Sequence, residues 1–542
     1  MKLTVLAALA LTTAMPALAK GPTVDAPAGT VRGYKDGSVG VFKGIPYAQA
    51  PIGELRWKPP FALPRWEGSK LATDFGPACV QPQGGPANIY SGADKLPVSE
   101  DCLTLNVWQP ARAKKAPVLV WIHGGALVGG SSREPLYDGR HMAERGVMVV
   151  SINYRLGVLG WMAHPELSAE SGEGVSGNYG LLDQVAALRW VKDNIAAFGG
   201  DPDNVTIAGE SAGGLSVMYL MASPAARGLF DKAIAQSAYM ISTPELKKGA
   251  FGSPAAEDIG KFVSAGLQAP DLAALRKLDA QELTDKAAKL GFAPFGTVDG
   301  KVLPRQLVDT FDKGEQAPVP ILAGFNQGEI RSLKILAPKA PDSAEEYEEQ
   351  IREKYGDLAD AFLALYPPKD YRESIIATTR DALYGWTAER LVRSQTAAGQ
   401  GGYLYLFDHG YPAMDNAGLH AFHASELPYV FGTPARVGPL WPRIPDTVRE
   451  RAMSDAMLGY WTSFAKDGTP VAPKAPEWHP YAHGGSFMWF GDVPTPSAGL
   501  MPGMFALNEE VMCRKRATGT VGWNWNVGLA SPVLPAGTPA CD

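Results

Sequence analysis

Long apolar runs, a surplus of basic residues and internal repeats are all absent from this sequence. After the first nineteen residues, no stretch reaches the roughly 18 consecutive apolar residues that a membrane-spanning helix needs. Lys and Arg number 50 against 56 Asp and Glu, which gives a formal net charge of −6 and no surplus of cations for nucleic-acid phosphates. We therefore expect neither stable membrane insertion nor a nucleic-acid partner. Nothing in the sequence indicates an oligomeric state.

Cysteine is also scarce, with only Cys79, Cys102, Cys513 and Cys541. Residues 1–19, "MKLTVLAALALTTAMPALA", place one lysine before a short apolar run and end in a small-x-small pattern, which predicts a signal peptide. The chain is then periplasmic or secreted, and such compartments favour disulfides. Three pairings are possible. Closing short local loops, Cys79 with Cys102 and Cys513 with Cys541, is the simplest, and buried free thiols are the alternative.

Strand-like apolar segments alternate with helical patterns through the middle of the chain, which predicts an α/β architecture. A helix is expected within 178–200, ending at a Gly pair. Residues 240–400 are richer in charge and helical periodicity and are interpreted as insertions beside the sheet. We treat 20–542 as one domain with a C-terminal tail at 511–542. The expected strands are 118–122, 148–154, 204–210, 232–238, 319–325 and 402–409.

A serine stands between glycines in "VTIAGESAGG", residues 205–214. Gly209 to Gly213 fits G-x-S-x-G, the sharp turn from strand to helix that exposes a nucleophilic hydroxyl. Glycines weaken strands and helices, but a sharp turn requires them because a Cβ atom would collide there. The motif alone is common in glycine-rich chains, but here it follows a predicted strand and precedes a helix. Ser211 is therefore the candidate nucleophile.

A serine nucleophile needs a histidine base, and the base needs a carboxylate that orients it. With this motif the chain order is serine, acid, histidine. His423, in "AFHASELPYVFG", is the preferred base because small residues follow it in a loop, and His420 is its nearest competitor. Glu329, in "ILAGFNQGEIRS", follows a predicted strand and is the candidate acid. The histidines that this order leaves open are His409, His420, His423, His479 and His483.

Negative charge develops on the substrate oxygen during acyl transfer, and preorganised N–H groups must stabilise it. The segment "HGGALVGG" follows a predicted buried strand and matches an oxyanion loop. Gly124, Gly125 and Ala212, the residue after the nucleophile, are the expected donors. A histidine of ordinary pKa would make activity rise between about pH 6 and 7.

These motifs together resemble the type B carboxylesterase and cholinesterase family of α/β-hydrolases. The resemblance covers about residues 24 to 510 and implies a large, mostly parallel central sheet, with helices on both faces and long helical insertions. It also implies the Ser211, His423 and Glu329 triad, the three oxyanion donors, and Cys79 with Cys102 as the family's first disulfide loop. The segments that carry it are "VFKGIPYAQAPIGELRWKPP", "SEDCLTLNVW", "WIHGGALVGG", "NYGLLDQVAALRWVKDNIAAFGGDPDNVTIAGESAGG", "GFNQGE" and "HASELPYVFG".

The substrate pocket departs from that of cholinesterases. Those enzymes hold a quaternary ammonium on a tryptophan in the first disulfide loop, whereas Tyr90 is the only aromatic residue of this loop. Phe292 and Phe295 stand where the family lines its acyl pocket, with simple packing as the alternative. Glu210 resembles the family's acidic residue beside the nucleophile, with a structural carboxylate bonded to backbone N–H groups as the alternative. Cholinesterase activity is therefore not expected. Arg133 and Arg331 are candidates for attracting a substrate carboxylate, with simple solvation as the alternative.

The sequence thus predicts a serine carboxylesterase that acts on a small-molecule ester without a metal or cofactor. An inactive hydrolase-fold protein that serves in binding or adhesion is the alternative, although such chains usually lose a triad residue. A zinc site is a third possibility, because His420, His423 and Glu426 recur every three residues, as ligands on one helix face do. Pro428 argues against a long helix there.

Overall fold

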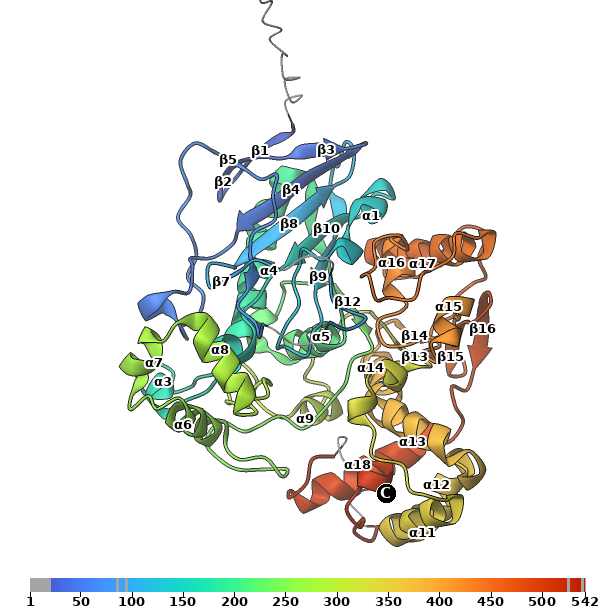
Figure 1. The fold of residues 1–542 in the computed structure, drawn as a ribbon. Coiled ribbons are helices and arrows are strands. Elements are labelled where there is room, and N and C mark those ends of the chain that lie inside the picture. Colours follow the sequence, from blue (N-terminus) through green and yellow to red (C-terminus); the bar gives the residue numbers. More distant parts are fainter. Residues whose placement is uncertain (1–20, 84–86, 93–95, 524–526, 538–540, 542) are drawn as a thin grey trace, which may run out of the picture.

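An eleven-stranded sheet runs through the molecule (Figure 1), and smaller sheets and helices surround it. In spatial order its strands are β16 (Pro494–Ala498), β15 (Ser486–Phe490), β14 (Gly402–Phe407), β13 (Ile321–Asn326), β12 (Lys232–Gln236), β11 (Gly200–Glu210), β9 (Ala116–Ile122), β10 (Met148–Ile152), β8 (Thr104–Gln109), β4 (Val39–Pro46) and β3 (Tyr34–Asp36). The computed structural model describes residues 21–83, 87–92, 96–523, 527–537 and 541. The expected signal peptide, residues 1–19, lies outside them.

The strands from β15 to β10 in this order run parallel, and the flanking pairs are antiparallel. This confirms the mostly parallel sheet expected from the sequence. The additional strands are β1 (Thr23–Ala26), β2 (Gly29–Arg32) and β5 (Ser69–Leu71) in one small sheet, and β6 (Ala78–Cys79) with β7 (Val98–Ser99) in another.

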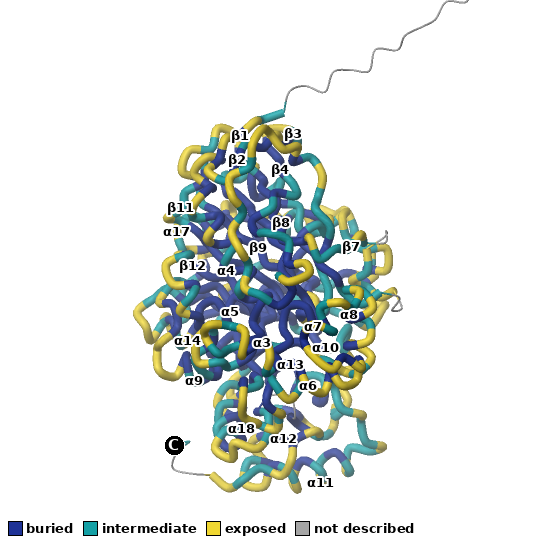
Figure 2. Tube along the Cα trace, turned by 90° about the vertical axis from the view of Figure 1, so that its left-hand side faces the viewer, coloured by how far each residue is buried: buried dark blue, intermediate teal, exposed yellow. Residues whose placement is uncertain are grey.

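Both faces of the sheet are buried, because side chains of a strand alternate between them. Along β9, Val118 and Val120 enter one core, whereas Leu119 and Trp121 enter the other. Figure 2 shows the buried centre that results. The first face packs on α4 (Tyr179–Asn194), α5 (Ala212–Ala222), α9 (Leu307–Asp312) and α14 (Trp386–Ala397), and the second on α1 (Arg140–Glu144), α15 (Pro412–Asn416), α16 (Leu427–Phe431) and α17 (Val448–Asp467).

The helical insertions form two further apolar clusters beside the sheet, as the sequence predicts. One joins α2 (Gly157–Trp161), α3 (Pro165–Glu170), α6 (Ala256–Gly266), α7 (Leu272–Lys277) and α8 (Ala280–Lys289). The other joins α11 (Ala344–Tyr355), α12 (Ala359–Leu365), α13 (Tyr371–Arg380) and α18 (Met504–Thr518), seen at the lower right of Figure 1. Among the helices of the described residues, none combines the length and apolar character that crossing a bilayer requires.

Two disulfides close the local loops that were the simplest pairing. Cys79 is bonded to Cys102 and Cys513 to Cys541, with Cα–Cα distances of 5.0 and 5.7 Å. The free-thiol alternative is therefore wrong. The first bridge encloses the loop between β6 and β8, and we call residues 79–102 the disulfide loop.

The glycines after the candidate nucleophile let α5 approach the sheet closely. A Cβ atom on Gly213 would lie 2.1 Å from the carbonyl oxygen of Ile122, at the end of β9. One on Gly209 would lie 2.5 Å from the Gly213 backbone, and one on Gly214 would lie 2.8 Å from the oxygen of Gln236. A side chain at any of these positions would push the helix away from the strand ends.

We predict that Gly213→Ala destabilises the protein by about 1–3 kcal/mol, because the added methyl group overpacks the contact between α5 and β9. Helix propensity alone would make Gly213→Ala stabilising by about 1 kcal/mol. A loss of stability would therefore indicate the steric contact with β9. Denaturant unfolding measures it. Gly172→Ala is the matched control, since its Cβ meets nothing within 4 Å. Equal stability of the two variants would contradict the prediction.

Candidate active site

Ser211 occupies a strained turn between β11 and α5. Its backbone has φ +58° and ψ −121°, a region that residues with side chains rarely adopt. Its N–H donates to the carbonyl of Gln236 at 2.9 Å, which fixes the turn against β12. The side chain is only half-buried, whereas every residue from Ala212 to Ala222 is buried. The turn therefore presents this hydroxyl, as the G-x-S-x-G motif predicts.

The glycine loop, residues 123–130 after β9, packs directly against this turn. A Cβ on Gly124 would lie 3.2 Å from the Cβ of Ser211, and Gly125 has φ +107°, a conformation that glycine adopts at no steric cost. Within the described residues, the N–H groups of Gly124, Gly125 and Ala212 donate to no protein acceptor. They are thus available to an oxygen bound beside Ser211.

Two buried rings hold the glycine loop in place. Nδ1 of His123 lies 2.8 Å from the carbonyl oxygen of Gly124, and the hydroxyl of Tyr154 donates to the carbonyl of His123 at 2.8 Å. The rings stack with centroids 4.6 Å apart. Burial lowers the pKa of His123 to about 4. The ring is therefore neutral at neutral pH, and its Nδ1–H can donate to Gly124.

Glu329 and His423 meet at the carboxyl end of the sheet. Glu329 opens α10 (Glu329–Ser332) directly after β13, and its buried carboxylate contacts Nδ1 of His423 through Oε2. The N–H of Asn326 donates to Oε1 of Glu329 at 2.8 Å. The carboxylate is therefore held from both sides, and it orients the imidazole with Nε2 pointing away from it.

Nε2 of His423 faces a second carboxylate. It lies 3.1 Å from Oε1 of Glu210, the residue before Ser211. In the described part of the chain the Ser211 hydroxyl makes no hydrogen bond. Hydrogen bonds of catalytic groups are often long before substrate binds. The structure thus places serine, histidine and glutamate on adjoining turns, with Glu210 as an additional partner of the histidine.

The two carboxylates set the charge of the imidazole. Burial by itself favours the neutral ring, but Glu210 and Glu329 outweigh it and raise the pKa of His423 to about 9. Burial also raises the pKa of the Glu210 carboxyl, an effect that His423 partly offsets. The rise in activity expected between about pH 6 and 7 assumes an unperturbed histidine, and these carboxylates favour a rise at higher pH.

Glu426, the third residue of the zinc hypothesis, has amide partners. Nε2 of Gln236 donates to Oε1 of Glu426 at 2.9 Å, and Nδ2 of Asn326 donates to Oε2 at 2.6 Å. Burial raises the pKa of this carboxyl. Among the described residues, no three His, Cys, Asp or Glu side chains gather as metal ligands. The zinc hypothesis fails because His420, His423 and Glu426 each face different partners.

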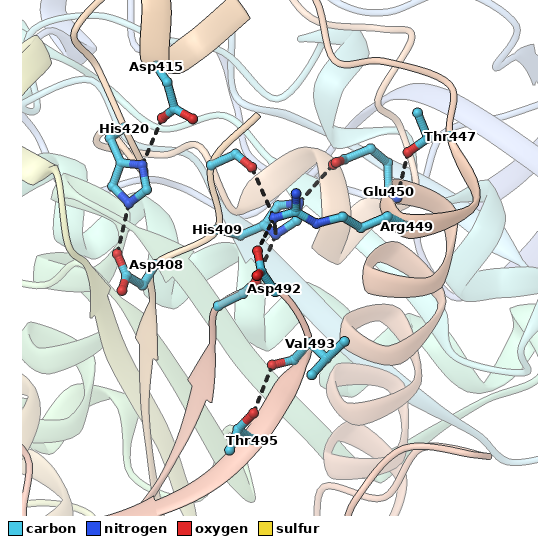
Figure 3. A network of polar contacts seen from close by, with 12 residues as sticks. Asp408, His409, Asp415, His420, Thr447, Arg449, Glu450, Asp492, Val493 and Thr495 are labelled. Carbon is cyan, nitrogen blue, oxygen red and sulfur yellow. Dashed lines mark hydrogen bonds and ion pairs between the residues drawn. The ribbon is translucent and has the colours of Figure 1, made fainter. Parts of the chain in front are cut away.

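The competing histidines are bound elsewhere (Figure 3). His420 lies between Asp408 and Asp415, at 2.9 and 2.8 Å, and the bond to Asp408 raises its pKa. His409 is buried between the carbonyl of Gly491 and Glu450, both at 2.8 Å. His423 is thus the histidine whose ring meets both Glu329 and Glu210.

The pocket candidates divide among different environments. Phe292 packs on the apolar cluster of α2 and α8, and Phe295 packs on the main core. Arg331 is paired with Glu373 at 2.6 Å, and Arg133 donates to the carbonyl of Gly76 at 3.4 Å.

Tyr90 does reach the site, because its hydroxyl contacts the backbone of His423.

Sequence reasoning missed Asn326, Gln236 and Tyr384. The ring of Tyr384 lies 5.4 Å from that of His423, on a π-helical turn, Asp381–Gly385, and such turns are frequent at functional sites. A usable signal existed for the two amides. Both end parallel strands that are neighbours in the sheet, where polar side chains converge on a ligand site.

A presented hydroxyl, an imidazole oriented by a carboxylate and unused N–H groups are the groups that attack on an ester carbonyl requires. Fold and site together define an α/β-hydrolase of the serine type.

Comparison with known proteins defines the family. The model of the Carboxylesterase family matches residues 20–495, and the chain belongs to this family. It is 36% identical over 493 residues to fumonisin B1 esterase of Sphingopyxis macrogoltabida, covering 87% of each chain. It is 37% identical over 474 residues to para-nitrobenzyl esterase of Bacillus subtilis, covering 84% of this chain and 91% of that one.

A solved PNB esterase structure superimposes with a TM-score of 0.76 at 34% identity, over 90% of this chain and 99% of the other. The protein is thus a serine carboxylesterase, a hydrolase of small-molecule carboxylic esters. The alternative of an inactive binding protein finds no support among these relatives, which carry esterase names.

We predict that Glu210→Gln moves the acidic limb of the pH profile of kcat/KM to lower pH. The histidine acts as a base only when neutral, and its pKa is raised above the ordinary 6.5, so the wild-type limb should lie above pH 6.5. Removing the charge of Glu210 makes the imidazolium less stable and lowers this pKa. Glu349→Gln, an exposed change, is the control. An unmoved limb in Glu210→Gln would contradict the assignment.

Proposed function

We propose that Ser211, His423 and Glu329 hydrolyse the ester through an acyl-enzyme. The Ser211 hydroxyl attacks the ester carbonyl while Nε2 of His423 takes its proton. The C–O bond to the alcohol then breaks, and the same nitrogen gives the proton to the departing oxygen. Water adds to the acyl-enzyme by the same steps, releasing the acid and restoring the serine. No atom beyond those of the ester and one water is consumed.

The oxyanion donors in this proposal are the N–H groups of Gly124, Gly125 and Ala212. Their support is that they donate to no protein acceptor among the described residues and adjoin Ser211. Losing one such donor typically costs about 100- to 1,000-fold in rate. The neutral His123 and Tyr154 keep the loop ready, so little reorganisation is needed when charge develops.

The single observation that carries the assignment is the contact of His423 with buried Glu329 beside a strained, presented Ser211. Substrate binding must then bring Oγ of Ser211 and Nε2 of His423 within hydrogen-bond reach. Glu210, whose Oε1 lies 3.1 Å from Nε2, would attract the charged ring electrostatically.

The substrate we propose is a small-molecule carboxylic ester, and the relatives that support this carry the names fumonisin B1 esterase and para-nitrobenzyl esterase. The net charge of −6 speaks against nucleic acid as a partner. We further propose export, to the periplasm or the medium, on the pattern of residues 1–19 and the two disulfides, which persist in oxidising compartments. Residues 20–542 would then form one catalytic domain.

A panel of chromogenic esters with acyl chains of increasing length, including carboxylate-bearing and para-nitrobenzyl esters, tests the function. We expect turnover by the wild-type protein and loss to the background rate in Ser211→Ala, since the nucleophile is removed. Ser69→Ala, at an exposed strand position, is the matched control and should retain full activity. Turnover that survives in Ser211→Ala would refute the serine assignment.

Glu329→Gln should lower kcat on the order of 10³- to 10⁴-fold with little change in KM, because the amide no longer stabilises the imidazolium or its tautomer. Glu373→Gln, which alters only a surface pair with Arg331, should stay near wild type. Steady-state kinetics with one ester measure both variants. An undiminished kcat in Glu329→Gln would point to another carboxylate as the orienting acid.

A further inference from the structure

Tyr90, in the disulfide loop, contacts two segments that carry residues of the proposed triad. The hydroxyl of Tyr90 lies 3.1 Å from the carbonyl oxygen of His423 and 2.7 Å from Oγ of Ser332. Ser332 is the last residue of α10, the short helix that Glu329 opens. A single phenol therefore joins the segments that carry the base and the acid.

The direction of these hydrogen bonds follows from the number of protons. A phenol has one proton to donate, whereas a serine hydroxyl can donate or accept. The carbonyl of His423 can only accept. Tyr90 can donate to the carbonyl of His423 while its oxygen accepts from Ser332, whose Oγ also lies 3.4 Å from the carbonyl of Glu329.

The backbone at His423 needs an external anchor. Ala421 and Ala424, on either side, have φ of +42° and +67°, conformations that residues other than glycine seldom adopt. The carbonyls of Ala421 and Phe422 are held by Gly328 and Asn326. Within the described residues, Tyr90 is the only donor to the carbonyl of His423.

The Tyr90 ring is itself held by aromatic neighbours. Its centroid lies 6.2 Å from that of Trp441 and 6.4 Å from those of Phe422 and His423, with near-perpendicular planes to Trp441 and His423. Edge-to-face pairs of this kind are favourable and fix ring orientation. Although Tyr90 is 38% exposed as a residue, its hydroxyl end faces inward.

The disulfide loop also forms hydrogen bonds with the glycine loop, which carries the proposed oxyanion donors Gly124 and Gly125. Nε2 of Gln81 donates to the carbonyl of Gly130, and the N–H of Gly130 donates to Oε1 of Gln81, both at 3.0 Å. Gly130 ends the glycine loop, and a Cβ atom there would lie 2.6 Å from Nδ1 of His123, so the lack of a side chain lets it pass the ring. Gln81 lies two residues after Cys79, so the bridge fixes this anchor.

We propose that Tyr90 is a positioning residue, which holds the backbone of His423 so that Nε2 can pass its proton to the departing alcohol. The proposal rests on the function proposed above for His423. The disulfide loop then serves catalysis through two anchors, Tyr90 at the base and Gln81 at the oxyanion loop. A role of Tyr90 as a wall of the substrate pocket is the competing interpretation, and kinetics separate the two.

The test compares Tyr90→Phe with wild type on an ethyl ester and on the nitrophenyl ester of the same acid. An alkoxide leaving group needs a proton from His423, whereas nitrophenolate leaves without one. We expect kcat/KM to fall about three- to tenfold for the ethyl ester, the worth of one hydrogen bond, and less for the nitrophenyl ester, with KM unchanged. Ser332→Ala, which removes the contact with Tyr90 and a long one to the carbonyl of Glu329, should show the same pattern with a smaller loss.

Tyr460→Phe is the matched control, because its hydroxyl also donates to a backbone carbonyl, that of Pro476, outside the site. It should leave both rates unchanged, and thermal unfolding should show Tyr90→Phe to be folded. A raised KM with equal losses on both esters would overturn the proposal in favour of a pocket wall, and unchanged rates in Tyr90→Phe would overturn it outright. Because all comparisons require turnover that Ser211→Ala abolishes, failure of the underlying function is recognised separately.

Discussion

Everything in this site depends on keeping one imidazole between two buried carboxylates. His423 lies against Glu329 on one nitrogen and Glu210 on the other, in surroundings from which water is largely excluded. Buried charges are costly unless they are paired and hydrogen-bonded. Both carboxylates favour the charged ring and burial opposes it, and together they raise the pKa of His423. In the proposed mechanism the same attraction would stabilise the imidazolium.

Hydrogen bonds from surrounding polar groups lower the free-energy cost of burying several carboxylates close together. Glu426 receives hydrogen bonds from two side-chain amides, those of Gln236 and Asn326, and Trp461 donates to Gln236 at 3.0 Å. A third carboxylate is thus accommodated near the histidine without a metal ligand set. Because Gln236 and Asn326 end neighbouring parallel strands, the sheet itself determines the spacing of these two amides.

Most of the fold and the triad could be predicted from local sequence. Strands such as Val118–Ile122 are short apolar runs ending in glycine, and Ser211 stands in a motif whose backbone geometry only glycine neighbours permit. Glu329 and His423 were found because the motif dictates their order along the chain. For the strands and the turn at Ser211 the signal lies within about ten residues, where turn chemistry and side-chain periodicity act, whereas Glu329 and His423 remain candidates chosen by chain order.

What the sequence by itself determined is the sheet, the elbow at Ser211 and the chemistry of an ester hydrolase. Only the tertiary structure decided which groups share the imidazole, and how. Glu210 contacts His423 although more than two hundred residues separate them, and Tyr90 contacts it across more than three hundred. Arg331, a candidate for binding a substrate carboxylate, forms an ion pair with Glu373. Such pairings depend on how distant loops pack, and so does the pKa of the base, since burial and charge set it through space and not along the chain.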